Sequence, residues 1–193
     1  MAKKILRVGF DLDGVLLYNP ARLARMPVAT FKHLFFPARE RKFFIPRSFW
    51  AEKIWSLAHL SSLFIASGFD DLETLLKKDG IEAYVITARF NFLQNNANSW
   101  FKKLNRNNVF KQLYVNTHNQ QPHFYKEKLT NQLKLDIFVD DNYDIVRYLS
   151  KKTKADIFWI YNLLDWPINY PHKFSSLKGV VNKITSITKY GKE

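Results

Sequence analysis

The feature that most restricts the fold of this chain is a set of short apolar segments that each end in polar residues. The clearest three are residues 5–10, 83–86 and 137–139, and residues 112–115 and 156–161 are two further candidates. Short apolar runs bounded by polar residues are typical of strands buried on both faces of a sheet. The chain is therefore expected to contain a sheet of about five strands, which is a usual size.

Between these segments the apolar residues recur at helical spacing, over residues 69–78, 92–104, 126–133 and 142–150. Strands that alternate with helices form right-handed crossover units, and these units build a parallel sheet with helices on both faces. The sequence therefore predicts an α/β fold with a Rossmann-like, doubly wound parallel sheet. Residues 175–189 are expected to form a last helix packed on that sheet.

One long interval interrupts this alternation. Residues 16–68 lie between the first strand and its return helix, which is far longer than an ordinary connection. Part of the interval has helical spacing, and prolines divide it into short pieces. We expect a small helical cap at 16–68, inserted into a core domain made of 1–15 and 69–193. A cap near the carboxyl edge of the sheet would cover the crevice where α/β proteins bind ligands.

Two pairs of carboxylates follow predicted strands. Asp11 and Asp13 come after the first strand and precede Gly14, which lets the backbone turn sharply, and Asp140 and Asp141 follow a later strand. Turn formation or helix capping would also explain aspartates at such positions. However, carboxylates gathered at one edge repel one another unless a cation neutralises them. A hard divalent cation such as Mg²⁺ is the simplest explanation of both pairs.

Three weaker signals accompany the acidic pairs. Thr87 ends another predicted strand, where its hydroxyl could donate to a phosphoryl oxygen, and Arg89 lies two residues further on. Lys126 or Lys128 precedes the second acidic strand and could offset the negative charge there. Taken singly, each signal has an ordinary explanation, as a common strand end, a structural arginine or a solvent-exposed helix face.

In this order along the chain, the acid pair, the threonine, the lysine and the second acid pair resemble the motifs of the haloacid dehalogenase (HAD) superfamily of phosphotransferases. Residues 11–15 match its first motif and Thr87 its second. The interval between these two motifs makes the chain similar to the family's small-molecule phosphatases, and to its 5′-nucleotidase and deoxyribonucleotidase-like members, which carry a cap at that place.

The resemblance implies catalytic roles for individual residues. Asp11 would attack phosphorus to form an aspartyl phosphate, and Asp13 would protonate the leaving oxygen and then activate water. Thr87 and Lys126 would hold the phosphoryl oxygens. Lys126 is preferred to Lys128 as the motif lysine, and Lys128 is kept as an alternative.

The resemblance also implies a cofactor and further substrate contacts. Mg²⁺ would be bound by Asp11, by the backbone carbonyl of Asp13 and by a carboxylate of the Asp140 and Asp141 pair. Asp141 is the first choice in that pair. Arg89 and Lys128 are the candidates for substrate binding.

These roles indicate a Mg²⁺-dependent phosphomonoester hydrolase that acts through an aspartyl-phosphate intermediate. Family members that remove halide lack a carboxylate at the position of Asp13, so a dehalogenase is disfavoured. A phosphotransferase would share the same site residues. The alternative from another class is a catalytically weak HAD-fold module that binds nucleic acid or protein through a basic, aromatic cap.

The charge of the chain bears on its partners. The formal net charge is +13, which attracts anions such as phosphorylated molecules. Within 16–68, basic residues lie among aromatic ones, which could stack on bases and hold phosphates. The expected substrate is a phosphorylated small molecule, with a nucleotide or a nucleic-acid end as the leading class. A cap whose rings form its own core is an equal alternative, and contact with a membrane surface is the least favoured.

The remaining composition restricts chemistry and location. The chain has no cysteine, which excludes disulfides, thiolate zinc sites and cysteine nucleophiles. Residues 1–7 lack the pattern of a signal peptide, and no apolar run approaches the length of a membrane span. The expected location is the cytoplasm.

Overall fold

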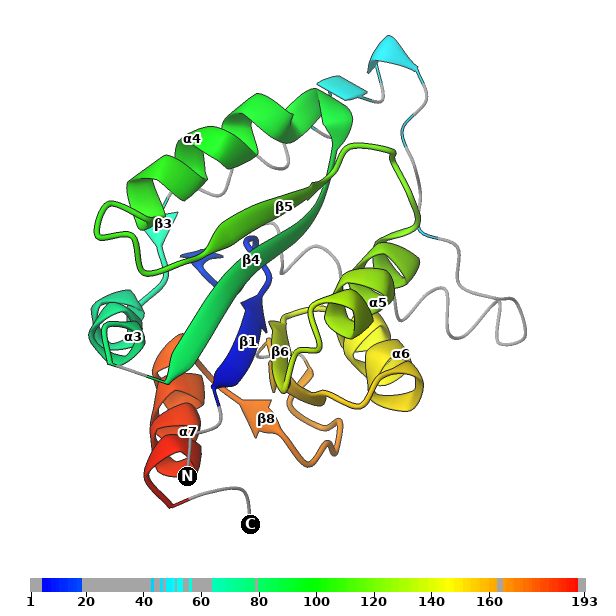
Figure 1. Ribbon diagram of the computed structural model, residues 1–193. Coiled ribbons are helices and arrows are strands. Elements are labelled where there is room, and N and C mark those ends of the chain that lie inside the picture. The colour runs from blue at the N-terminus through cyan, green and yellow to red at the C-terminus, as the bar shows by residue number, and fades with distance from the viewer. Residues whose placement is uncertain are drawn as a thin grey trace.

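The computed structural model describes residues 5–18, 43, 46, 48–50, 52–53, 56, 64–78, 80–162 and 165–190. Their main element is a six-stranded parallel sheet in the order β5, β4, β1, β6, β7, β8 (Figure 1). The strands are β1 (Leu6–Phe10), β4 (Ile81–Phe90), β5 (Gln112–Asn116), β6 (Ile137–Asp140), β7 (Asp156–Ile160) and β8 (Lys173–Phe174). The predicted α/β fold is confirmed.

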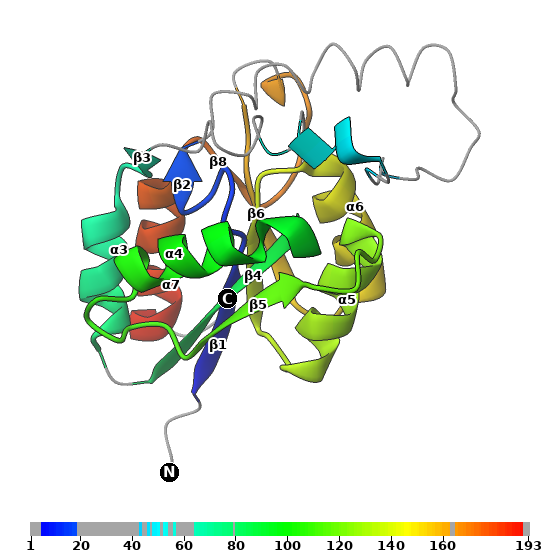
Figure 2. The ribbon, with the colours of Figure 1, turned by 90° about the horizontal axis from the view of Figure 1, so that it is seen from above.

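Helices cover both faces of this sheet (Figure 1, Figure 2). The helices beside the sheet are α3 (Phe69–Leu76), α4 (Gln94–Leu104), α5 (Pro122–Gln132), α6 (Tyr143–Lys152) and α7 (Leu177–Tyr190), with a short 3₁₀ turn at Asn91–Leu93. Helices α5 and α6 pack together on one face, and α3 and α7 pack together on the other. Residues of α4 belong to the same core cluster as those of α3 and α7. The sheet is thus doubly wound, as predicted.

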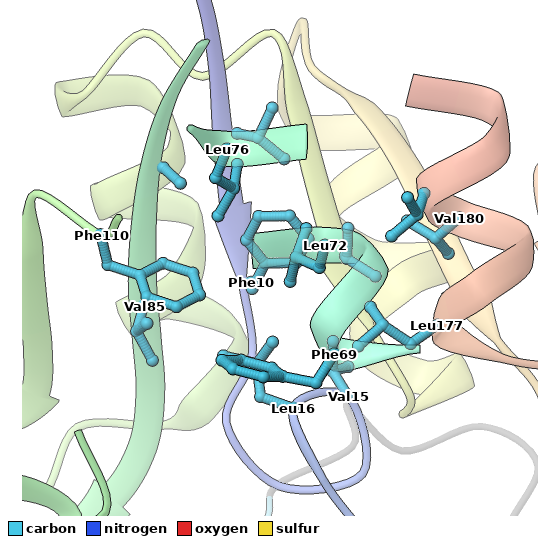
Figure 3. Packing of buried hydrophobic residues seen from close by; sticks show 14 of the residues in the cluster. Phe10, Val15, Leu16, Phe69, Leu72, Leu76, Val85, Phe110, Leu177 and Val180 are labelled. Atoms are coloured by element: carbon cyan, nitrogen blue, oxygen red, sulfur yellow. The ribbon is translucent and has the colours of Figure 1, made fainter. Parts of the chain in front are cut away.

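Alternate residues of each strand face the two helical layers. Phe10 of β1 packs with Leu72 of α3 and Val180 of α7 (Figure 3). Phe138 of β6 faces the opposite layer and packs with Leu149 of α6. All five side chains are completely buried. Burying a side chain of this kind contributes about 1.5–3 kcal/mol, so the two clusters hold the sheet and its helices together.

The observed elements differ from the predicted ones mainly at their ends. Strand β4 continues to Phe90, four residues past its predicted end. Helix α5 begins at Pro122 rather than 126, because proline fits the first turn of a helix, where its missing N–H has no intrahelical partner. Strand β8 was not predicted, since two residues are too few to produce a periodic pattern.

The strand order reverses direction at β1. From β1 the chain runs to β4 and β5, and it then returns to the other side of β1 to form β6, β7 and β8. At such a switch point the loops after neighbouring strands leave in opposite directions, so a ligand-binding crevice forms at the carboxyl ends. The ends of β1, β4 and β6 therefore surround one place.

The long interval leaves and rejoins the core at that same edge. Strand β2 (Leu17–Tyr18) pairs with β3 (Phe64–Ile65) in an antiparallel ribbon. Leu16 and Leu17 are buried in the main core cluster. Most of the expected cap at 16–68 lies outside the described residues, so its boundaries and its helical character stay predictions. None of the helices in the described parts of the chain is both long enough and apolar enough to cross a membrane.

Candidate active site

The first acidic pair lies in a tight, buried loop after β1. The N–H of Asp11 donates to the carbonyl of Val139 on β6, 2.9 Å away, which continues the pairing of the two strands. The loop then turns back at Gly14, whose φ is +80° and whose N–H donates to the carbonyl of Leu17. Asp11 and Asp13 are 6% and 5% exposed. Both residues are therefore buried at the carboxyl end of β1 rather than on the open surface.

Gly14 also allows the two acidic loops to approach closely. A Cβ atom at this position would overlap Oδ2 of Asp141 and would lie 2.5 Å from its Cγ. The positive φ and this close contact both require a residue without a side chain. The glycine of the first motif is thus explained by the position of the second acidic pair.

The second acidic pair follows β6 and is also buried, with Asp140 at 0% and Asp141 at 4% exposure. Neither residue caps the following helix: the N-cap of α6 is Asn142, whose side chain accepts from the N–H of Asp144. Helix capping, the alternative explanation from the sequence, therefore does not account for these two carboxylates. The indole Nε1 of Trp159 donates to the carbonyl of Asp141, which holds the loop against β7.

Lys126 joins the two acidic loops. Its Nζ atom lies 3.2 Å from Oδ1 of Asp11 and 2.7 Å from Oδ2 of Asp140, and its side chain is 2% exposed. Lys128 lies two residues further along α5 and is exposed. Since two residues correspond to about 200° of rotation around a helix, the two lysines face different directions. The structure brings Lys126 into the cluster and does not bring Lys128 there.

Thr87 and Arg89 lie beside an irregularity in β4. The register of β4 against β5 shifts between Thr87 and Phe90. A bulge of this kind turns side chains away from the regular alternation, and bulges are common beside active sites. The hydroxyl of Thr87 accepts from the N–H of Arg89 at 3.2 Å, which leaves its own proton to donate. Both residues are buried, at 1% and 2% exposure.

The guanidinium of Arg89 binds side chains of the protein itself. Its Nε and Nη2 atoms donate to the two carboxylate oxygens of Asp13, at 2.8 and 2.7 Å. Its Nη1 atom donates to Oδ1 of Asn96 on α4. Sequence reasoning placed Arg89 among the substrate-binding residues and did not single out Asn96, because one asparagine in a polar helix carries no motif signal.

The electrostatics of the cluster follow from its burial. Burial, followed by the nearby carboxylates of Asp140, Asp141 and Asp13, raises the pKa of Asp11 well above its ordinary value, although Lys126 acts in the opposite direction. Burial likewise raises the pKa of Asp140. Burial alone would lower the pKa of Lys126, but the carboxylates of Asp11 and Asp140 outweigh it and raise that pKa. The lysine therefore stays protonated.

The donor set fits a hard divalent cation. Carboxylate oxygens of Asp11, Asp140 and Asp141 lie within 4.8 Å of one another, and all three residues are buried. The buried groups at this edge comprise four carboxylates and two cationic side chains, which leaves a formal excess of two negative charges. Oxygen ligands and this charge suit Mg²⁺, and nothing in the cluster offers the nitrogen or sulfur ligands typical of zinc.

Comparison with known proteins relates this fold to solved structures. No family model and no curated protein matches the chain. A HAD-superfamily hydrolase from Ehrlichia chaffeensis has a TM-score of 0.52 at 14% identity, covering 97% of this chain and 99% of that one. For CbbY from Rhodobacter sphaeroides in complex with phosphate, the TM-score is 0.57 at 13% identity, with 91% and 96% covered.

A third solved structure is similar over nearly all of both chains. The presumed HAD-hydrolase YfnB from Bacillus subtilis, bound to magnesium, has a TM-score of 0.58 at 12% identity, and the match covers 95% of this chain and 100% of that one. At these identities the likeness concerns the fold alone. The chain has the Rossmann-like α/β fold of HAD-superfamily hydrolases, in agreement with the resemblance of its motifs.

Proposed function

We propose that this chain is a Mg²⁺-dependent phosphomonoester hydrolase of the HAD type, with Asp11 as its nucleophile. The observation that carries the proposal is the buried cluster in which Lys126 lies within 3.2 Å of Asp11 and 2.7 Å of Asp140. Each member of the cluster stands at the carboxyl end of a strand or on the helix beside it, and each matches a position of the motif pattern. The fold shared with solved HAD hydrolases supports the same proposal.

In the proposed reaction, a carboxylate oxygen of Asp11 attacks phosphorus while the bond between phosphorus and the leaving oxygen breaks. Asp13 gives a proton to the leaving oxygen. In the second step Asp13 takes a proton from water, and the water oxygen displaces the carboxylate of Asp11 from phosphorus. Free phosphate and the original Asp11 carboxylate result, so atoms and charges balance.

The other buried polar residues would hold the phosphoryl group. The hydroxyl of Thr87 and the ammonium of Lys126 are donors to its oxygens, and the positive charge of Lys126 offsets the charge that develops there. Asp11, Asp141 and the backbone carbonyl of Asp13 would hold Mg²⁺, with Asp140 as a further ligand or as the partner of Lys126. When bound, the cation shields the negative phosphate from the negative nucleophile.

We further propose a phosphorylated small molecule as substrate, with a nucleotide or a nucleic-acid end as the leading class. The net charge of +13 favours anionic substrates. Phe49 and Trp50 are exposed, and the Nζ atom of Lys53 lies 4.5 Å from the centre of the Phe49 ring. Exposed rings beside a cation are suited to stacking on a base. A cytoplasmic location is consistent with such a substrate.

Phosphate release by the purified chain, with and without Mg²⁺, tests the proposal. The panel comprises nucleoside monophosphates, sugar phosphates and p-nitrophenyl phosphate. Asp11→Asn removes the nucleophile with little change of shape, and Asp70→Asn, at an exposed position of α3, is the matched control. Mg²⁺-dependent release that is lost only in Asp11→Asn is expected. Release that survives in Asp11→Asn, or no release from any substrate, would contradict the proposal and favour a binding module.

A further inference from the structure

Asp13 is held by a side chain from another strand in an arrangement that the motif pattern does not contain. The guanidinium of Arg89 binds both of its carboxylate oxygens, with N–O distances of 2.8 and 2.7 Å. The side chain of Arg89 is 0% exposed and that of Asp13 is 7% exposed. Two parallel hydrogen bonds between a planar guanidinium and a carboxylate fix the plane of the carboxylate as well as its distance.

Arg89 is itself fixed from the side opposite to Asp13. Its Nη1 atom donates to Oδ1 of Asn96. Asn96 lies in the first turn of α4, whose residue Ala97 is completely buried in the core. The position of Asn96 is therefore set by the packing of the helix on the sheet. The bulge after Thr87 turns Arg89 toward this pair of partners.

We infer that Arg89 and Asn96 are positioning residues that fix the orientation of the Asp13 carboxylate, and that Arg89 is not a substrate contact. The inference rests on the proposed function, in which Asp13 transfers a proton to the leaving oxygen. A carboxylate has about four lone-pair sites, and Arg89 uses two of those of Asp13. A fixed carboxylate plane aims these sites, and a misplacement of about 1 Å can cost roughly 100-fold in rate.

Two substrates with different leaving groups distinguish a positioning role for Arg89 and Asn96 from direct contact with the substrate. An alkyl leaving group, as in a nucleoside 5′-monophosphate, needs a proton from Asp13, whereas p-nitrophenolate leaves without one. The ratio kcat/KM covers the steps up to aspartyl-phosphate formation, so it reports protonation of the leaving oxygen. Asn96→Ala is expected to lower kcat/KM for the nucleotide by roughly 10–100-fold. For p-nitrophenyl phosphate the change should stay below about threefold.

Matched variants control this experiment. Asn95→Ala, at an exposed position of the same helix, should leave kcat/KM unchanged for both substrates. Arg89→Lys keeps the charge but loses the paired hydrogen bonds, and it should show the same selectivity between substrates as Asn96→Ala. Equal losses of kcat/KM on both substrates would overturn the inference, as would an effect on KM alone, which is the signature of a substrate contact.

A second measurement does not depend on activity. Crystal structures of Asn96→Ala and Asn95→Ala would place the Asp13 carboxylate directly, and it should be rotated in the first variant and unchanged in the second. An unchanged carboxylate in Asn96→Ala would overturn the inference even if turnover falls. A wild-type chain that releases no phosphate would instead contradict the proposed function, while the crystal structures would still decide what holds Asp13.

Discussion

The Nζ atom of Lys126 lies 2.7 Å from Oδ2 of Asp140, and both side chains are buried. The same Nζ atom is 3.2 Å from Oδ1 of Asp11, so one ammonium group connects the loops after β1 and β6. A buried charge that loses its partner is costly, because neither water nor another ion replaces the interaction. The lysine is therefore expected to support the fold as well as the proposed chemistry.

Removing this ammonium group should destabilise the protein. Lys126→Met keeps the size of the side chain but leaves Asp11 and Asp140 without it, which is expected to lower the free energy of unfolding by about 3–5 kcal/mol. Lys128→Met, at an exposed position of the same helix, should change it by less than about 0.5 kcal/mol. Urea unfolding of both variants measures the difference, and similar values for the two would show that Lys126 is not a buried partner of the acidic loops.

A side chain at Gly14 should disturb the proposed metal site. In Gly14→Ala the new Cβ atom would meet Asp141, and the backbone φ of +80° would be strained. We expect Mg²⁺ affinity to fall by roughly 10–100-fold, as for other changes that displace a ligand. Gly179→Ala is the control, because its nearest neighbouring atom is 3.5 Å away. Calorimetric titration measures both affinities. Unchanged Mg²⁺ affinity in Gly14→Ala would show that Asp141 is not a ligand of the metal.

Mg²⁺ itself should stabilise the folded chain. A ligand at 100 times its Kd that binds only the folded state adds about 2.7 kcal/mol to the free energy of unfolding. For a chain of this size, that corresponds to a rise in Tm of roughly 5–11 °C. The rise should be absent in Asp141→Asn and present in Asp70→Asn. A Tm that does not respond to Mg²⁺ in the wild-type chain would argue against a magnesium site.

The metal-free protein should lose stability from this cluster as the pH rises. Burial raises the pKa of Asp11 and of Asp140 above 3.8 in the folded state. The folded state therefore binds more protons than the unfolded state at pH values between 3.8 and the raised pKa values. The stabilisation contributed by these two groups is present below that interval and is lost as the pH rises through it.

Other carboxylates contribute to the same pH range, so a difference between two proteins isolates the cluster. Urea unfolding in the presence of EDTA would compare the wild-type chain with Asp140→Asn. The unfolding free energy of the wild type minus that of the variant is expected to fall from about pH 4 upward. A difference that grows with pH would mean that these carboxylates have lowered pKa values in the folded protein.

The fold was predictable because its signals are local. The apolar run of β1 and the helical spacing of apolar residues in α3 arise because these side chains are buried, and such patterns can be recognised in the sequence alone. Strand β8 escaped prediction because a two-residue strand has no period. The bulge in β4 escaped as well, since it depends on register against β5 and not on residue type.

The sequence indicated residues that the structure brings together in one buried cluster, but it indicated few of their contacts. The motif order indicated the aspartates, Thr87 and a lysine, while spacing alone left Lys126 and Lys128 both open. The packing of α5 distinguishes them, because Lys126 is buried beside Asp11 and Asp140 whereas Lys128 is exposed. The partners of Arg89 lie on a loop and a helix whose proximity no local pattern encodes, so the sequence suggested a substrate contact where the structure has Asp13 and Asn96.

The amino-acid sequence by itself determined which residue types follow each strand, and thereby that carboxylates, a hydroxyl and cations gather at one edge of a parallel sheet. The tertiary structure alone decided which of these groups touch. Hydrogen bonds and ion pairs form only within about 3–4 Å, and whether two side chains come that close depends on strand order, register and helix rotation. Those relationships join residues far apart in the chain, such as Asp13 with Arg89 and Asp11 with Lys126.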